Sequence, residues 1–186
     1  MKNTIVWVYG LSAIGKETFV RHVAENKPKQ LIDELGWNDH EIVVCQESID
    51  HVVKKENDGN KELRKNLEKV ILKLSEAHSG AVILIKTQDL DFDFNHLVNI
   101  KKQLPNDDHV MIYLYDDPNV VYTRYQKKEW WVPEFTLDVY KKDLVTQSGY
   151  LNEYKELGFK MIGLQSDQEQ LYPIIDISFL LKSKNT

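Results

Sequence analysis

The sequence of 186 residues has a single cysteine and no apolar run near the roughly 18 residues that a membrane-spanning helix requires. A lone Cys45 cannot form an internal disulfide and favours a reducing compartment. The chain opens directly on an apolar strand pattern, so we expect no secretory signal. These absences predict a cytoplasmic protein without a membrane partner.

Positive charge is also scarce, since 24 lysines and arginines face 29 acidic residues and give a formal net charge of −5. Proteins that coat nucleic acids need a concentrated basic face, so we expect no nucleic-acid polymer as a partner. Only Arg21, Arg64 and Arg124 are arginines, which makes each a candidate ligand for a small-molecule phosphate. The six histidines lack paired metal-ligand spacing, which predicts no zinc site.

The most informative stretch is the first twenty residues. An apolar strand over residues 4–9 runs into the spacing Gly10-x4-Gly15-Lys16, and a helical apolar pattern follows. This pattern predicts a phosphate-binding loop, in which backbone N–H groups and a helix N-terminus hold a polyphosphate while the lysine reaches its outer phosphates. An ordinary strand-turn-helix junction with two glycines is the alternative. The predicted binding residues are Gly10, Leu11, Ser12, Ala13, Ile14, Gly15, Lys16, Glu17 and Thr18.

The loop departs from the usual pattern at its last position. A serine or threonine there would place a hydroxyl on Mg²⁺, but this chain has Glu17. Thr18 follows, although a turn of about 100° per helical residue places it on another side of the helix. We take Thr18 as a candidate magnesium ligand.

Strand and helix patterns alternate along the chain and predict one α/β domain with a parallel sheet and helices on both faces. Such a sheet brings all its strand C-termini to one edge, beside the loop. We expect a polar loop over residues 53–61, and a closing helix or extended segment over 169–182. The expected strands cover residues 4–9, 41–45, 81–85, 110–115 and 159–164, and the expected helices 16–26, 29–35, 63–77, 94–104, 118–128 and 136–157.

The ending Gly15-Lys16-Glu17-Thr18, the chain length and a later arginine helix followed by a break resemble the P-loop small-molecule and nucleotide kinases, over nearly the whole chain. Adenylate kinases and phage-type deoxynucleoside monophosphate kinases share the Gly-Lys-x-Thr ending. The resemblance implies a P-loop NTPase three-layer sandwich with strand order 2-3-1-4-5 and a mobile LID at about 125–136. It also implies ATP and Mg²⁺ as cofactors and phosphoryl transfer to a nucleotide or related small molecule, above all a nucleoside or deoxynucleoside monophosphate.

The same resemblance implies catalytic roles for three residues. Lys16 would bind the β- and γ-phosphates, and Arg124 would act from the LID arm. Glu47 matches the position of an acidic residue near the acceptor hydroxyl, with a surface glutamate as an equal alternative. Asp89, displaced from the aspartate that the family often has after the third strand, is a further candidate magnesium ligand. Lys127 and Lys128 would join Arg124 on ATP, with a solvated helix face as an equal alternative.

Other features leave alternatives open. Arg64 could meet the acceptor's phosphate or pair with a nearby glutamate, and Trp130 and Trp131 fit a hydrophobic hinge better than a base-stacking site. A nucleotide-dependent switch would predict a guanine-reading Asn-Lys-x-Asp, which the sequence lacks. A degenerate P-loop protein that binds a nucleotide without turnover is the remaining alternative. The acceptor and the oligomeric state, a homodimer included, are not readable.

Overall fold

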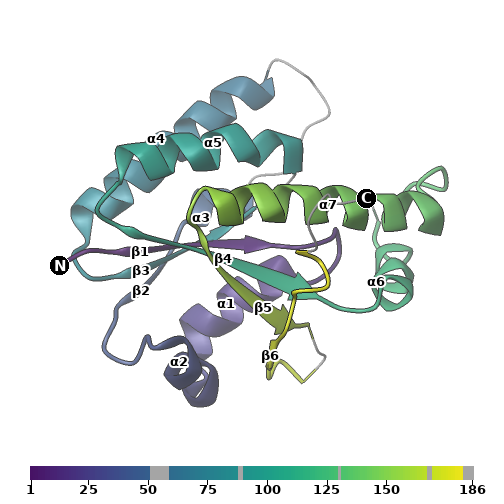
Figure 1. Cartoon of the computed structure of the whole chain (residues 1–186), viewed down its shortest axis with the longest axis horizontal. Coiled ribbons are helices and arrows are strands. Elements are labelled where there is room, and N and C mark those ends of the chain that lie inside the picture. Colours follow the sequence, from purple (N-terminus) through teal and green to yellow (C-terminus); the bar gives the residue numbers. More distant parts are fainter. Residues whose placement is uncertain (51–58, 88–89, 130, 167–168, 182–186) are drawn as a thin grey trace.

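The computed structural model describes residues 1–50, 59–87, 90–129, 131–166 and 169–181, without the side chains of 50, 59–65 and 90–94. A six-stranded sheet lies between two layers of helices (Figure 1). Its order is β2-β3-β1-β4-β5-β6, and the first five strands are parallel, whereas the last is antiparallel to β5. The strands are β1 (Thr4–Tyr9), β2 (Ile42–Val44), β3 (Val82–Lys86), β4 (Asp108–Tyr115), β5 (Lys160–Gln165) and β6 (Ile174–Ile175).

The helices cover both faces of this sheet. In Figure 1, α1 (Lys16–Asn26) and α2 (Lys29–Leu35) lie below it, and α4 (Gly59–Ala77), α5 (Leu90–Gln103) and α7 (Leu137–Glu156) lie above it. Two shorter helices, α3 (Gln46–Asp50) and α6 (Pro118–Tyr125), follow β2 and β4. This arrangement confirms the predicted layers and the order 2-3-1-4-5 of the parallel strands.

The central strand β1 separates two hydrophobic cores because successive side chains of a strand point to opposite faces. Val6 and Val8 belong to the core that contains Phe19 of α1. Ile5 and Trp7 belong to the other core, with side chains of α4, α5 and α7. These four side chains of β1 are all buried, as expected of a parallel strand covered on both faces.

Local signals set several helix ends. The Asp117 carboxylate accepts a hydrogen bond of 2.8 Å from the Asn119 backbone N–H, and Pro118 occupies the first turn of α6. Thr136 caps α7 in the same way, and Gly36 ends α2 with a left-handed φ of 75°. The bounds of α1 and α2 agree with the prediction.

Other boundaries were wrong. The helix α3 was not predicted, α4 begins at Gly59 inside the expected loop, and α6 ends at Tyr125 before the two lysines. Most of that expected loop, residues 53–58, lies outside the described residues. Of the two alternatives expected near the end of the chain, the extended segment agrees with the structure, because Ile174 and Ile175 form β6 and pair with β5, and Pro173 interrupts a helix.

No helix within the described ranges is both long and apolar enough to pass through a lipid bilayer.

Gly163 of β5 packs closely against Ile175 and Ile177, and a substitution at this glycine tests that packing. A Cβ at this position would lie 2.3 Å from the Ile177 side chain and 2.8 Å from the Ile175 carbonyl oxygen. We expect Gly163→Ala to lower the free energy of unfolding by about 1–3 kcal/mol, the usual cost of overpacking. Urea unfolding of the variant and of the unmodified protein measures this difference in the free energy of unfolding.

Gly149→Ala is the matched control, because Gly149 lies within α7 and an added Cβ would meet nothing within 4 Å. This variant should be stabilised by up to about 1 kcal/mol, the helix propensity of alanine over glycine. Equal stability changes in the two variants would contradict the packing at Gly163.

Candidate functional site

The carboxyl ends of the parallel strands meet at one edge of the sheet, on the right of Figure 1, where the loop after β1 lies. Polar residues follow or end the other strands at the same edge. They are Glu47 after β2, Lys86 at the end of β3, Asp116 after β4 and Ser166 after β5. Clefts at this edge are the usual ligand sites of open α/β sheets.

The loop itself depends on its first glycine. Gly10 has a φ of 143°, and a Cβ there would lie 2.6 Å from the carbonyl oxygen of Leu114 in β4. Ala13 and Gly15 also have positive φ, of 62° and 101°. Alternation of left- and right-handed residues turns successive N–H groups toward one concave side, which makes an anion-binding nest. Gly15 then starts α1 without a side chain that could cap its first N–H groups.

Two side chains from distant elements fix this loop. The Ser166 hydroxyl donates a hydrogen bond of 2.7 Å to the carbonyl oxygen of Ile14, and the Tyr140 hydroxyl of α7 donates one to the carbonyl oxygen of Ser12. Burial raises the pKa of Tyr140, so its hydroxyl remains a donor at neutral pH. The loop backbone is thus held by β5 and α7 as well as by its own glycines.

Lys16 lies over the loop. Its ammonium donates hydrogen bonds of 2.7 Å to the carbonyl oxygen of Gly10 and 3.1 Å to that of Leu11. These contacts hold a positive charge at the mouth of the nest. A bound polyphosphate would offer the same ammonium charged oxygens in place of neutral carbonyls, and such charge-assisted bonds are stronger.

Glu17 stands in an ion-pair network with two cations. Its Oε1 accepts a hydrogen bond of 3.0 Å from Nε of Arg21, and its Oε2 lies 3.7 Å from Nζ of Lys86. The Lys86 side chain is only 12% exposed, and Nζ also donates to the carbonyl oxygen of Ile49 at 3.2 Å. The sequence analysis missed Lys86. The signal was available, because an acidic residue after the loop lysine coincides with a basic residue at the end of β3.

The described residues do not fit a magnesium site at the loop end. The Glu17 carboxylate is engaged by two cations, and the described side chains include no group of three or more His, Cys, Asp or Glu that could hold a metal ion. Thr18 is exposed on α1, and Asp89 lies outside the described residues. Their assignment as magnesium ligands stays a prediction.

Arg124 reaches the same edge from the end of α6. Its Nη2 donates a hydrogen bond of 2.8 Å to Oδ2 of Asp116, whose Oδ1 accepts a longer bond of 3.3 Å from Gln165. Arg124 is also close enough to Tyr140 to lower its pKa against the larger effect of burial. Because Asp116 follows β4, Arg124 lies at the edge of the sheet where the phosphate loop begins. Lys127 and Lys128 follow α6 and are exposed, and their role stays a prediction.

Glu47 is exposed on α3, where the Cys45 thiol lies 3.9 Å from its carboxylate. Burial raises the pKa of Cys45 to about 12, so the thiol stays protonated and unreactive at neutral pH. Ser48 fixes this helix to the sheet, since its hydroxyl accepts the Lys86 backbone N–H at 3.0 Å. Glu47 thus lies on the element beside Lys86. Its catalytic role stays a prediction, and the side chain of Arg64 lies outside the described residues.

The predicted LID segment, 125–136, carries an aromatic cluster at its two ends. The ring centroids of Tyr125 and Phe135 are 5.2 Å apart, and both rings lie within 6 Å of Tyr140. Trp131 is partly buried against the same core, and Trp130 lies outside the described residues. The ends of the segment therefore pack on the tyrosine that holds the loop.

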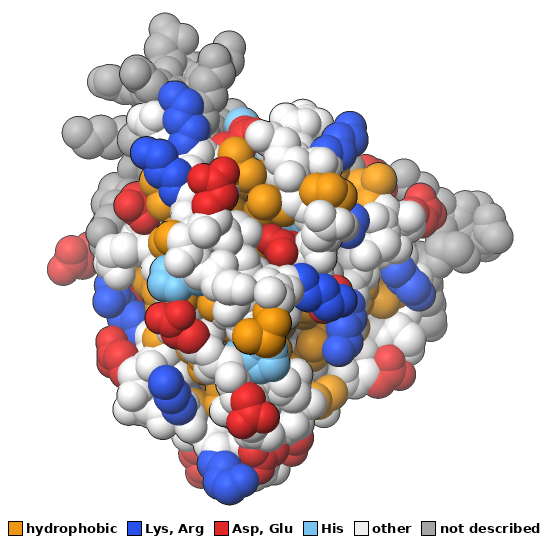
Figure 2. Space-filling model, turned by 90° about the vertical axis from the view of Figure 1, so that its left-hand side faces the viewer, with side chains coloured by type: hydrophobic (Ala, Val, Ile, Leu, Met, Phe, Trp, Pro, Cys, Tyr) orange, Lys and Arg blue, Asp and Glu red, His pale blue; other side chains and the backbone are white. Residues whose placement is uncertain are grey.

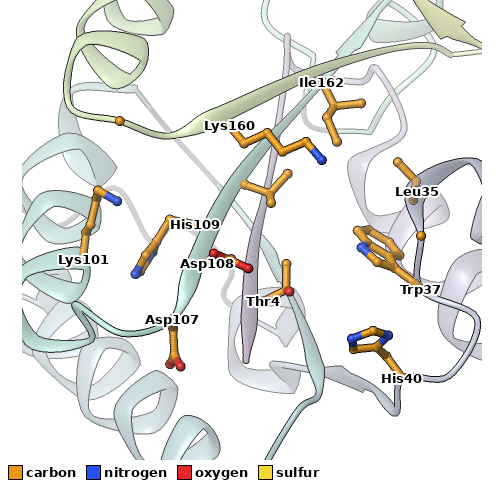
Figure 3. Close-up of a pocket in the computed structure, with 13 residues that line it drawn as sticks. Thr4, Leu35, Trp37, His40, Lys101, Asp107, Asp108, His109, Lys160 and Ile162 are labelled. Atoms are coloured by element: carbon orange, nitrogen blue, oxygen red, sulfur yellow. The ribbon is translucent and has the colours of Figure 1, made fainter. Parts of the chain in front are cut away.

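A pocket of about 420 Å³ lies at the opposite, amino edge of the sheet (Figure 3). Trp37 and His40 face it from one side, and Asp108 and Lys160 line it where β4 and β5 begin. Figure 2 looks onto this face, where lysines, acidic residues and histidines are interspersed. The pocket belongs to the far side of the sheet and not to the phosphate loop.

The Tyr140 contact generates a prediction about the loop. Tyr140→Phe removes the bond to Ser12 while keeping the ring in its core, so we expect ATP to bind roughly fivefold more weakly, the worth of about 1 kcal/mol. Calorimetric titration with ATP measures the change.

Tyr113→Phe is the control, because the Tyr113 hydroxyl also makes a buried hydrogen bond, of 2.8 Å to Gln147, but does not contact the loop. It should lower stability by a similar amount and leave the ATP affinity unchanged. An equal loss of affinity in both variants would show that Tyr140 has no particular role at the loop.

No protein-family model and no curated protein matches the sequence. The structure, however, is similar to shikimate kinase from Bacteroides thetaiotaomicron, with 13% identity over 91% of this chain and 90% of that chain and a TM-score of 0.52. It is also similar to a structure from the PezAT chromosomal toxin-antitoxin system of Streptococcus pneumoniae, with 14% identity over 100% of this chain and 74% of that chain and a TM-score of 0.53. The chain therefore has the fold of the P-loop kinases, with β6 added to the edge of the sheet.

Proposed function

We propose that the protein is an ATP-dependent kinase that phosphorylates a small molecule, with a nucleoside or deoxynucleoside monophosphate as the first acceptor class to test. One observation carries the proposal. The phosphate loop holds Lys16 at its mouth, and Lys86 and Arg124 reach the same edge of the sheet. Phosphoryl transfer depends mainly on positioning and on neutralising the charge of the transferring group, which is what this arrangement supplies.

In the proposed reaction an acceptor oxygen attacks the γ-phosphorus of ATP. The new oxygen–phosphorus bond forms as the bond to the β,γ-bridging oxygen breaks, and ADP leaves with that electron pair. The loop N–H groups and Lys16 hold the β- and γ-phosphates, and Arg124 offsets charge on the transferring group. An acceptor hydroxyl would give its proton to Glu47, whereas an acceptor phosphate needs no base.

The acceptor class is the finer part of the proposal. The Gly-Lys-x-Thr ending favours a nucleoside monophosphate, whereas similarity to a protein named shikimate kinase favours a small hydroxylated acid. A screen for ADP release should therefore contain nucleosides, nucleoside monophosphates, sugars and hydroxylated carboxylic acids. Rapid ADP release with one acceptor class, above a slow background with ATP alone, is the expected result.

Nucleotide binding without turnover is the second candidate, and the ion-paired Glu17 favours it. The two candidates differ in ADP release, since a protein that only binds would take up ATP and release no ADP with any acceptor.

We expect Lys16→Met to reduce the rate of phosphoryl transfer by 100-fold or more, because the transferring phosphates lose their charged donor. This reduction corresponds to an activation free energy higher by about 3 kcal/mol. The fold should stay intact, since the hydrogen bonds of Lys16 described above go to carbonyls of the loop and not to the core. Turnover and thermal unfolding are measured on the same sample. Turnover near that of the unmodified protein would remove the loop from the mechanism.

Arg124→Ala should lower kcat far more than it weakens ATP binding, because Arg124 lies on α6 beside the predicted LID and would align with the phosphates in the closed complex. Arg124→Lys is the matched variant, which keeps the charge but not the planar donor pair, and should recover part of kcat. Steady-state kinetics and ATP titration separate the two effects. Equal losses in kcat and in ATP affinity would show that Arg124 contributes only to binding.

A further inference from the structure

Two positions near the phosphate loop carry side chains of a different charge from those expected in a P-loop protein. In P-loop NTPases magnesium is held by a hydroxyl after the loop lysine and by a carboxylate from a neighbouring strand. This chain has a carboxylate at the first position, Glu17, and an ammonium at the end of the neighbouring strand, Lys86. The two side chains face each other, 3.7 Å apart.

We propose that the Lys86 ammonium takes the charge-neutralising place of the metal ion and binds the β- and γ-phosphates of ATP directly, so that ATP binding does not require Mg²⁺. This inference rests on the proposed nucleotide site. It assigns a phosphate-binding role to Lys86 and a positioning role to Glu17 and Arg21.

The position of Lys86 is fixed by its neighbours. Its backbone N–H donates to the Ser48 hydroxyl, its ammonium donates to the carbonyl oxygen of Ile49, and its side chain is largely buried. In β3, Lys86 pairs with Val8 of β1, two residues before Gly10. The ammonium is therefore held beside the loop, with a carboxylate of the first helical turn as its neighbour.

The distances from the Glu17 carboxylate to its two cations indicate which cation can move to a phosphate. Arg21 makes a 3.0 Å hydrogen bond to one carboxylate oxygen, whereas Lys86 lies 3.7 Å from the other, beyond hydrogen-bond distance. Lys86 can turn toward a phosphate oxygen while Arg21 continues to neutralise Glu17. An ammonium has three donors, so it can bind a phosphate and keep the Ile49 contact.

The charges of the network support this assignment. Glu17 alone would repel a polyphosphate at the N-terminus of α1, but Arg21 offsets its charge. Lys16 and Lys86 then present two positive charges to the β- and γ-phosphates. A divalent ion supplies the same total charge, but it needs oxygen ligands, and the carboxylate at this position is already paired.

The test is a calorimetric titration of the full chain with ATP, in buffer with Mg²⁺ and in buffer with EDTA. The unmodified protein should bind ATP with a Kd that changes by less than about threefold between the two buffers. Lys86→Met should raise the Kd in EDTA by about 10- to 100-fold, the worth of a charge-assisted hydrogen bond. Lys86→Arg should keep most of the affinity.

Lys2→Met is the matched control, because Lys2 also pairs with a carboxylate, at 2.8 Å from Asp108, but lies at the opposite edge of the sheet. Its Kd should equal that of the unmodified protein in both buffers. Circular dichroism checks that the Lys86→Met variant folds. If this variant does not fold, the proposal is still tested by the ATP affinity of the unmodified protein in the two buffers and by the ATP affinity of Lys86→Arg.

Two results would overturn the role of Lys86 and leave the nucleotide site standing. They are an ATP affinity that falls tenfold or more in EDTA, and a folded Lys86→Met variant that binds ATP in EDTA as tightly as the unmodified protein. A chain that binds no ATP in either buffer would overturn the proposed function, and the role of Lys86 with it.

Discussion

The close approach of the Gly10 backbone to the Leu114 carbonyl determines where the candidate site begins. Because β1 lies between β3 and β4, its loop must leave the sheet over the end of β4, and any side chain at position 10 would collide there. From that point the loop turns back to start α1, and Ser166 and Tyr140 fix its carbonyls. The site is thus a product of the parallel sheet, whose strands deliver residues from distant parts of the sequence to one edge.

Charge at this edge is organised in pairs. Asp116 holds Arg124, and Glu17 lies between Arg21 and Lys86, so each of these two acidic side chains orients at least one cation before any ligand arrives. Oriented cations need less reorganisation when a phosphate binds, which favours binding and, in an enzyme, transition-state stabilisation. A phosphate site needs only a few local cations, so the net charge of −5 of the whole chain does not exclude one.

The sequence predicted the parts of the structure that depend on local pattern. The strand over residues 4–9, the loop glycines and the bounds of α1 and α2 all follow from patterns along the chain. The errors arose where tertiary pairing decides. The helix α3, which was not predicted, is fixed through Ser48 to β3. Lys86 was missed for a related reason: its partner, Glu17, lies 69 positions away along the chain, and spacing along the sequence does not show that the two side chains meet.

The outermost strands of the sheet are its shortest, with three residues in β2 and two in β6. An exposed strand edge offers unpaired N–H and C=O groups to any other chain that can add a strand, and length makes such pairing stable. Here a second molecule would find only short edges, while the long, apolar strands β1 and β4 are enclosed in the middle. Short outer strands therefore limit edge-to-edge pairing, and on the β5 side β6 covers the backbone of Gly163 and Leu164.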